Sequence, residues 1–413
     1  MRVALCASVF FAAFGTASVL AQESSAATAP AAKTAAPTGK ASASQKHLLE
    51  LANQAFLRMP LVPHIKNRGR GQMAVVEACF ELAMPELALQ IGDTIPDWRR
   101  GLAHAQFAHH CAQAGRMDEV GQHLAIAESV AKAAAADPTE QAWRADRVFA
   151  MIARTHFLLG DAEKFAKFSK SIQSSDGAGI QMDAALAMPE AAFSAWLEQA
   201  DKLFAGDNFD EILVTLQTCC KLYKRFFPDA EKRDQLEKRV TSGYTKLPRD
   251  ARLKLLIEIA GYAADGGDGM RALELVRQID VLIAGVKWHP EDEVFVHAQA
   301  AAVVHRAGDS ARGRTLLEHA ESLYGQRHAS ILDIYRASAM RAIAEAAAAM
   351  GNRDRALELY RGAVEAGLDN PNSRPRADDV SATCLSLAKH GLEPGSELLG
   401  KIEAIVKGLG DPW

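Results

Sequence analysis

The sequence predicts an all-α protein, a right-handed α-solenoid of about seven to nine stacked antiparallel helical hairpins. Two observations predict this fold class. Alanine is abundant while aromatic residues make up only 7% of the chain, which favours closely packed helices. Helix-like runs also end repeatedly in glycine, and a new amphipathic run begins at once. These glycines recur at intervals of 45, 46, 61, 41 and 43 residues, at Gly115, Gly160, Gly206, Gly267, Gly308 and Gly351.

Each of these glycines has a physical reason to end a helix. Glycine adopts positive φ at little cost, so it commonly follows the last helical residue. The residue after it is usually an aspartate or asparagine, whose side chain accepts hydrogen bonds from the free N–H groups of a new helix. The expected starting residues are Asp161, Asp207, Asp268, Asp309 and Asn352.

The helix after each glycine carries a repeated apolar face. Positions five, nine and twelve residues on are mostly apolar or small, and these offsets share one side of a helix. Short side chains there allow the two helices of a hairpin to approach closely. The twelfth positions are Ala127, Ile172, Ala320, Ile279 and Ala363, with Cys219 in register after a one-residue insertion.

The clearest unit is AEAAAAMGNRDRALELYRGA, which runs from Ala344 to Ala363. It resembles the tetratricopeptide-repeat (TPR) family in its turn glycine, Gly351, and in Ala356, Tyr360 and Ala363 of the second helix. The period here exceeds the family's usual length of about 34 residues, and the family's proline after the second helix is mostly displaced or missing. The resemblance implies a groove that binds peptides or partner proteins.

The two ends of the chain differ from the repeats. Residues 1–21 have a positive start, an apolar run and small residues before Gln22, as in a cleaved secretory signal peptide; a transmembrane anchor is the alternative. Residues 22–45 hold hardly any large apolar side chain and predict a disordered linker. We therefore expect an exported protein, periplasmic or secreted, with no transmembrane segment after cleavage.

The remaining chain is expected to form three parts. N-terminal helical hairpins are expected over 46–95, with helices at 46–59 and 73–84; the repeat array spans 96–367, and the closing helices occupy 368–413. The five cysteines of the mature chain are expected to be small buried hydrophobes rather than disulfide partners. They are Cys79, Cys111, Cys219, Cys220 and Cys384.

A basic insertion makes one repeat interval longer than the others, in or near 227–248. Residues 221–254 contain eleven basic and five acidic residues, in a chain whose formal net charge is −4. One interpretation is a docking surface for an acidic partner; the other is a solvated helix with surface ion pairs. The candidate docking residues are Lys224, Arg225, Lys232, Arg233, Lys238 and Arg239.

The sequence offers no motif for catalysis or for a cofactor. It contains no HExxH, CxxC, GxSxG or P-loop pattern. His104, His109 and His110 lie on one expected helix, but spacings of five and six do not bring two rings to one metal ion. We therefore expect no metal site, and the net negative charge does not favour nucleic acid as a partner.

Two functions remain. The first is an interaction scaffold without catalysis that binds a protein or peptide in the solenoid groove, with candidate contacts at Arg99, Arg144, Arg147, Gln299 and Arg341. The second is an α/α-hairpin glycan-active enzyme or a wall-polymer-binding protein. A glycan cleft requires aromatic residues to converge with paired carboxylates, and the available tryptophans are Trp98, Trp143, Trp196 and Trp288.

Overall fold

The computed structural model describes residues 41–173 and 178–413, and its regular structure in these ranges is helical throughout. The predicted all-α repeat fold is confirmed. The expected signal peptide and most of the expected linker lie outside the described residues. The α-helices are α1 (Ala43–Arg58), α2 (Leu61–Glu81), α3 (Pro85–Asp93), α4 (Arg99–Gln113), α5 (Met117–Ala136), α6 (Trp143–Leu158), α7 (Ala162–Lys170), α8 (Ala178–Ala187), α9 (Phe193–Ala205), α10 (Phe209–Arg225), α11 (Ala230–Gly243), α12 (Arg249–Asp265), α13 (Gly269–Ala284), α14 (Pro290–Arg306), α15 (Ser310–Arg327), α16 (Asp333–Ala349), α17 (Arg353–Leu368), α18 (Ser373–Lys389) and α19 (Ser396–Gly408).

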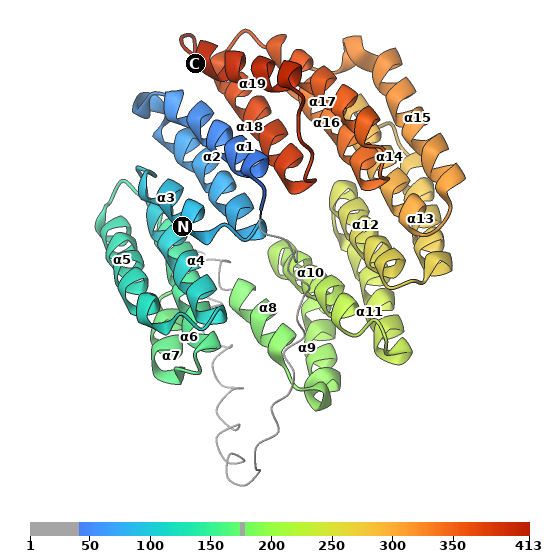
Figure 1. Cartoon of the computed structure of the whole chain (residues 1–413). Helices are drawn as coiled ribbons and strands as arrows, with labels where there is room; N and C mark the ends of the chain where they lie inside the picture. The colour runs from blue at the N-terminus through green and yellow to red at the C-terminus, as the bar shows by residue number, and fades with distance from the viewer. Residues whose placement is uncertain (1–40, 174–177) are drawn as a thin grey trace, which may run out of the picture. The chain divides into compact units, whose positions relative to one another are not determined.

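Neighbouring helices pack as hairpins, and the hairpins stack. Helix α4 packs on α5, α12 on α13, α14 on α15 and α16 on α17 (Figure 1). The even-numbered helices from α2 to α18 also contact one another in order, as an inner row. The odd-numbered helices from α5 onwards cover this row from outside, as expected for stacked hairpins.

The predicted glycine turns are confirmed at five of the six positions. Gly115, Gly160, Gly267, Gly308 and Gly351 all have positive φ. The aspartate or asparagine side chain accepts the expected N–H bond at the start of α7, α13, α15 and α17.

The sixth turn differs from the prediction. Gly206 ends α9 with φ −74°, and the expected starting residue, Asp207, does not begin the next helix. Asn208 does so instead, because its side chain accepts from the N–H groups of Asp210 and Glu211 at 3.1 and 3.4 Å. The one-residue insertion seen in the sequence lies here.

Close helix contacts explain why small residues recur. Ala127, Ala272, Ala320 and Ala356 are fully buried. A Cβ atom on Gly269 would lie 2.3 Å from the carbonyl oxygen of Ala307, so α13 meets the end of α14 through bare backbone.

The two ends of the array contact each other, since α1 packs on α18. Gln45 of α1 donates to the carbonyl of Ala388 of α18 at 2.8 Å, and Ser381 of α18 donates to the carbonyl of Ala52 at 3.0 Å. One hydrophobic core contains buried residues of both terminal hairpins. The stack of hairpins therefore closes on itself: both ends carry an apolar face, and each buries the other.

The helix boundaries at the N-terminal end also differ from the prediction. Helix α2 begins at Leu61, well before the predicted start at residue 73, although Val62 and Pro63 keep non-helical backbone angles within it. The basic insertion forms α11 and a short 3-10 turn, Tyr244–Lys246.

The five cysteines in the described residues are free and buried, as predicted. Burial raises the pKa of the Cys79, Cys219 and Cys384 thiols to about 12. Among the described residues, no helix combines the length and apolar character that crossing a bilayer requires.

Candidate functional site

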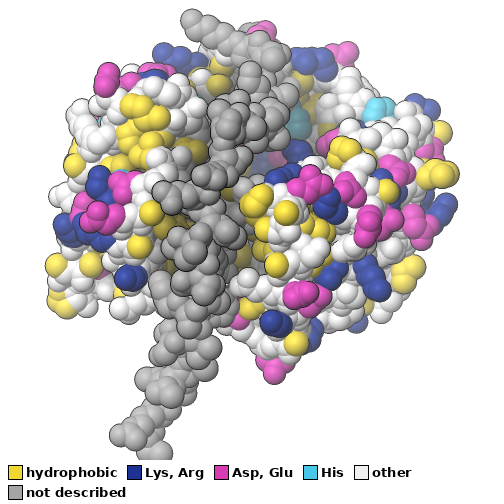
Figure 2. Space-filling view, turned by 90° about the horizontal axis from the view of Figure 1, so that it is seen from below, with side chains coloured by type: hydrophobic (Ala, Val, Ile, Leu, Met, Phe, Trp, Pro, Cys, Tyr) yellow, Lys and Arg dark blue, Asp and Glu magenta, His cyan; other side chains and the backbone are white. Residues whose placement is uncertain are grey.

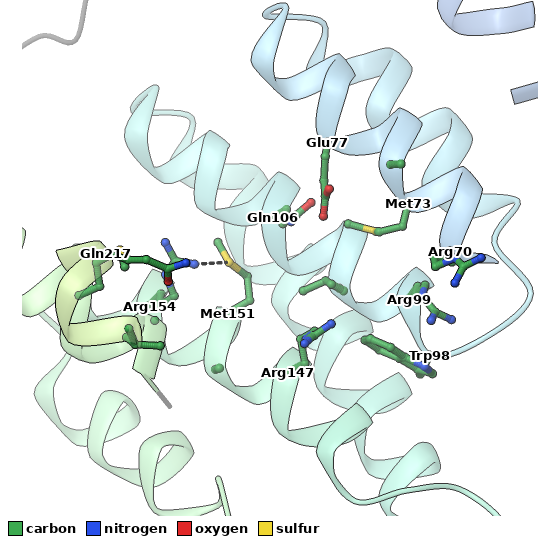
Figure 3. Close-up of a pocket in the computed structure, with 16 residues that line it drawn as sticks. Arg70, Met73, Glu77, Trp98, Arg99, Gln106, Arg147, Met151, Arg154 and Gln217 are labelled. Atoms are coloured by element: carbon green, nitrogen blue, oxygen red, sulfur yellow. Dashed lines mark hydrogen bonds between the residues drawn. The ribbon is translucent and has the colours of Figure 1, made fainter. Parts of the chain in front are cut away.

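A pocket of about 600 Å³ opens on the inner row of helices. Helices α2, α4, α6, α8 and α10 all contribute to its wall (Figure 3). Its lining combines arginine, methionine and glutamine side chains: Arg70, Met73, Glu77, Trp98, Arg99, Leu102, Gln106, Arg147, Met151, Arg154, Met182, Val214 and Gln217, together with Ala74, Ala150 and Gly179.

Arg99 is fixed at one end of the pocket by the turn before α4. Asp97 accepts a hydrogen bond from the Arg99 main-chain N–H at 3.0 Å and forms an ion pair with its guanidinium group. The Asp97 carboxylate lies against Gly69 of α2, where an added Cβ would be 2.7 Å from its Oδ2 atom. Gly69 therefore leaves the space that Asp97 needs to orient Arg99.

Two tryptophans support the same end of the pocket. Trp98 and Trp143 pack edge to face with ring centroids 5.5 Å apart. The guanidinium of Arg99 lies 4.6 Å from the Trp98 ring, and that of Arg147 lies 5.3 Å from the Trp143 ring. These cation–π contacts hold the two guanidinium groups against the tryptophan rings.

Arg154 and Gln217 stand at the other end (Figure 3). Arg154 pairs with Asp183 of α8 through two guanidinium nitrogens, and its Nη1 lies 3.8 Å from the sulfur of Met151. Gln217 extends from α10, where Lys221 and Lys224 follow on the same helix face. Lys221 donates to Glu258 at 2.8 Å, and its Nζ and that of Lys224 both approach the Tyr262 ring.

The middle of the pocket is less polar. Met73, Met151 and Met182 line it together with Leu102 and Val214. Among the described lining residues, Glu77 is the one carboxylate. Its pKa is raised, first by burial and then by Glu81, and Lys389 and Arg147 partly oppose the rise.

The predicted groove residues separate into two groups. Arg99 and Arg147 line the pocket, as the scaffold hypothesis requires. Arg144 lies beside them but is 5% exposed and pairs with Glu140. Gln299 on α14 and Arg341 on α16 lie outside the pocket lining, and Arg341 faces Glu345 at 3.9 Å.

Sequence reasoning missed Arg154 and the three methionines as pocket residues. Their helical spacing carried a signal: Arg147, Met151 and Arg154 recur at intervals of four and three, on one face of α6.

The basic helix α11 forms many ion pairs with neighbouring elements. Arg239 makes a bidentate pair with Asp201 at 2.8 and 2.9 Å, and Lys232 pairs with Asp229 at 2.6 Å and with Glu190. Arg233 pairs with Asp234 at 3.2 Å, and Arg225 donates to the carbonyl oxygens of α8 residue Leu186 and of Met188. Positive and negative side chains alternate over the face shown in Figure 2, where they form no single-sign surface.

The glycan hypothesis requires the four tryptophans to converge on one cleft, and only two of them meet. Trp98 and Trp143 meet, but Trp196 and Trp288 pack against a second hydrophobic core formed by α8 to α14. Trp98 is 6% exposed, so it offers little ring surface to a sugar. Among the described residues, no group of three or more histidine, cysteine, aspartate or glutamate side chains has the arrangement of a metal site.

Comparison with known proteins does not place the chain in a family. No family model and no curated protein matches it. A solved structure described as a "circular tandem repeat protein with novel repeat topology and enhanced subunit contact surfaces" is 14% identical, covering 88% of this chain and 94% of that chain at a TM-score of 0.23.

Proposed function

We propose that the protein is an exported interaction scaffold that binds a segment of a partner protein or peptide in the arginine-lined pocket, without catalysis. The observation that carries this proposal is the convergence of four arginines and three methionines from separate inner helices on one cavity. Arginine is enriched in binding hot spots, and flexible methionines adapt to varied side chains.

The proposal also covers how the protein leaves the cytoplasm and which repeat family its hairpins belong to. The apolar N-terminal run directs export to the periplasm or beyond, and the hairpins are a divergent TPR-like array of longer period. A rigid row of helices keeps the pocket ready before a ligand arrives, which lowers the entropic cost of binding.

The pocket favours a scaffold over a glycan-active enzyme. A glycosidase needs two carboxyl groups flanking the scissile bond, whereas Glu77 is the one carboxylate among the described lining residues. Arginines outnumber it, and their planar donors recognise an anionic group rather than a neutral sugar ring.

Site-specific photocrosslinking in the producing cell tests this function. A benzophenone amino acid replaces Gln217 at the pocket in one variant and exposed Lys238 on α11 in another. We expect a partner adduct from position 217 and none from position 238. Adducts from position 238 alone would place the partner on the basic helix, and no pocket adduct would contradict the proposal.

A further inference from the structure

We infer that the turn between α1 and α2 binds the surface of a membrane that contains anionic lipids. We call this turn, residues 57–66, the first-hairpin turn. The inference goes beyond the scaffold function and does not depend on the inner pocket. Three observations carry it: a cluster of exposed apolar side chains, positive charge in a stretch of chain without acidic residues, and a second exposed apolar turn at the same end of the molecule.

The first-hairpin turn exposes four large apolar side chains within nine residues: Leu57, Leu61, Val62 and Ile65. Val62 is 85% exposed. It lies where the backbone departs from helical angles, so this part of the chain does not pack as a regular helix. Apolar residues scattered singly over a surface need no explanation, whereas a cluster marks a contact site for a partner or a membrane.

The first-hairpin turn also lies in a stretch that lacks acidic residues. From residue 51 to residue 76 the chain has no aspartate or glutamate, but it has four lysine or arginine residues. Two of these, Arg58 and Lys66, are exposed, and neither forms an ion pair or hydrogen bond with another described residue. Long cationic side chains cover apolar surface with their alkyl part and keep the charge at the water interface, where lipid phosphates lie.

The other two arginines of this stretch already have partners. Arg68 donates to a main-chain carbonyl at 3.2 Å, and Arg70 donates to Asn67 at 3.4 Å. We therefore assign the contacts with lipid headgroups to Arg58 and Lys66 alone.

The first-hairpin turn lies at the same end of the molecule as the start of α18. Helices α1, α2 and α18 pack side by side (Figure 1). Gln45 near the start of α1 bonds to Ala388 near the end of α18, so these two helices are antiparallel. Helix α2 turns back beside α1 and is therefore parallel to α18, and Lys389 meets Glu81 where both helices end.

A second exposed apolar turn lies beside the start of α18. Arg336 near the start of α16 pairs with Asp369, which follows α17 and shortly precedes α18. Four large apolar side chains are exposed around this pair: Leu332, Ile334, Tyr335 and Leu368. The other carboxylate here, that of Asp333, accepts a main-chain N–H at 2.8 Å. A flat lipid surface can contact both turns at once, which favours a membrane over a partner that fits one pocket.

The two kinds of side chain act together at a membrane. Apolar side chains gain free energy by leaving water for the boundary between headgroups and acyl chains, and basic side chains gain it from anionic headgroups. A few side chains of each kind give a reversible attachment to the surface. Binding should therefore require both the anionic lipid and the apolar residues of the turn.

Cosedimentation of the mature full chain with lipid vesicles tests the inference. We expect binding to vesicles of equal parts phosphatidylglycerol and phosphatidylcholine, and much weaker binding to phosphatidylcholine alone. Arg58→Gln with Lys66→Gln should weaken binding to the anionic vesicles at least about tenfold. Leu61→Ser with Val62→Ser should weaken it by at least about the same factor.

Matched control variants remove the same kinds of side chain elsewhere. Lys238→Gln with Arg314→Gln removes two exposed positive charges from α11 and α15. Met117→Ser with Met270→Ser removes two exposed apolar side chains at the starts of α5 and α13, beside the glycine turns at the other ends of the inner helices. Both controls should bind as the wild type does. Circular dichroism and unfolding midpoints establish that each variant is folded.

A fluorescent label locates the contact. Val62→Cys and Met270→Cys each provide an exposed thiol for an environment-sensitive probe, since the cysteines of the described residues are buried. Emission from position 62 should shift to shorter wavelength on anionic vesicles, and emission from position 270 should not change.

The outcomes decide between a membrane and other partners. No binding to anionic vesicles, binding that the turn variants leave unchanged, or binding without a shift at position 62 would overturn the inference. Dimer formation that Leu61→Ser with Val62→Ser abolishes, in the absence of vesicle binding, would assign the turn to a second copy of the chain. None of these results bears on the inner pocket, which photocrosslinking at position 217 tests separately.

Discussion

Gln45 Nε2 on α1 donates a hydrogen bond of 2.8 Å to the carbonyl oxygen of Ala388 on α18, across 343 residues of sequence. Lys389, next along α18, pairs with Glu81 of α2 at 2.7 Å. The terminal hairpins therefore hold each other, and the inner helices α2 and α18 become neighbours. Glu81 in turn acts on Glu77 in the pocket, so this junction reaches the candidate site.

Loss of one buried hydrogen bond at this junction should destabilise the fold. Ser381 is 1% exposed and donates to the carbonyl of Ala52 at 3.0 Å. We expect Ser381→Ala to lower the free energy of unfolding by about 1 kcal/mol. Urea unfolding measures this change. The control is Ser242→Ala, because the Ser242 hydroxyl bonds a carbonyl of its own helix on the surface; an equal loss in both variants would contradict the role of the junction.

Replacing the glycine at the start of α13 should destabilise the fold. Gly269→Ala places a Cβ 2.3 Å from the Ala307 carbonyl oxygen, so α13 must move away from α14. We expect a loss of about 1–3 kcal/mol, as for other overpacked contacts. Gly121 lies within α5 with open space around it, and Gly121→Ala should stabilise by about 0.5–1 kcal/mol. Thermal unfolding of both variants checks the difference in sign.

Buried histidines should make stability fall in mild acid. Burial, followed by Arg154, lowers the pKa of His109 to about 4, and burial also lowers the pKa of His104 and His123. The unfolded chain then binds more protons, so this stability is complete above about pH 6.5 and is lost as pH falls towards about 4.

His109→Gln should remove part of this pH dependence, on the order of 2 kcal/mol between about pH 7 and about pH 4. Urea titrations across that range measure it. The control is His289→Gln, at an N-cap position without a side-chain cap bond. An unchanged pH dependence in His109→Gln would contradict the burial argument.

Asp379 should change stability with pH in the direction opposite to that of the histidines. Burial raises its pKa from 3.8 to about 7, although Arg341 lowers it. The folded state therefore holds this proton more tightly than the unfolded chain. Its contribution to stability is complete below about pH 4 and is lost as pH rises towards 7. We expect Asp379→Asn to gain stability relative to wild type between about pH 5 and about pH 8, on the order of 2 kcal/mol. A constant difference between the two proteins over that range would show that Asp379 does not titrate there.

The sequence predicted the hairpins well because their signals are local. Gly267 followed by Asp268 both ends α12 and begins α13, and each step needs only nearby backbone groups. Gly206 misled the prediction because one inserted residue moved the start of α10 to Asn208.

Contacts between distant residues could not be predicted in the same way. Nothing local to Gln45 indicates Ala388, because both lie on ordinary amphipathic helices whose apolar faces fit several partners. Arg99 and Arg147 were predicted as groove residues from their place on the first helix of a hairpin. Arg154 and Met182 joined them only through the packing of α4, α6 and α8.

A crystal structure of the protein with the partner segment captured at position 217 tests the central claim most directly. The account predicts density for the partner segment in the inner pocket, with an apolar side chain against Met73, Met151 or Met182. Peptide density on the α11 surface, with the inner pocket empty, would contradict it.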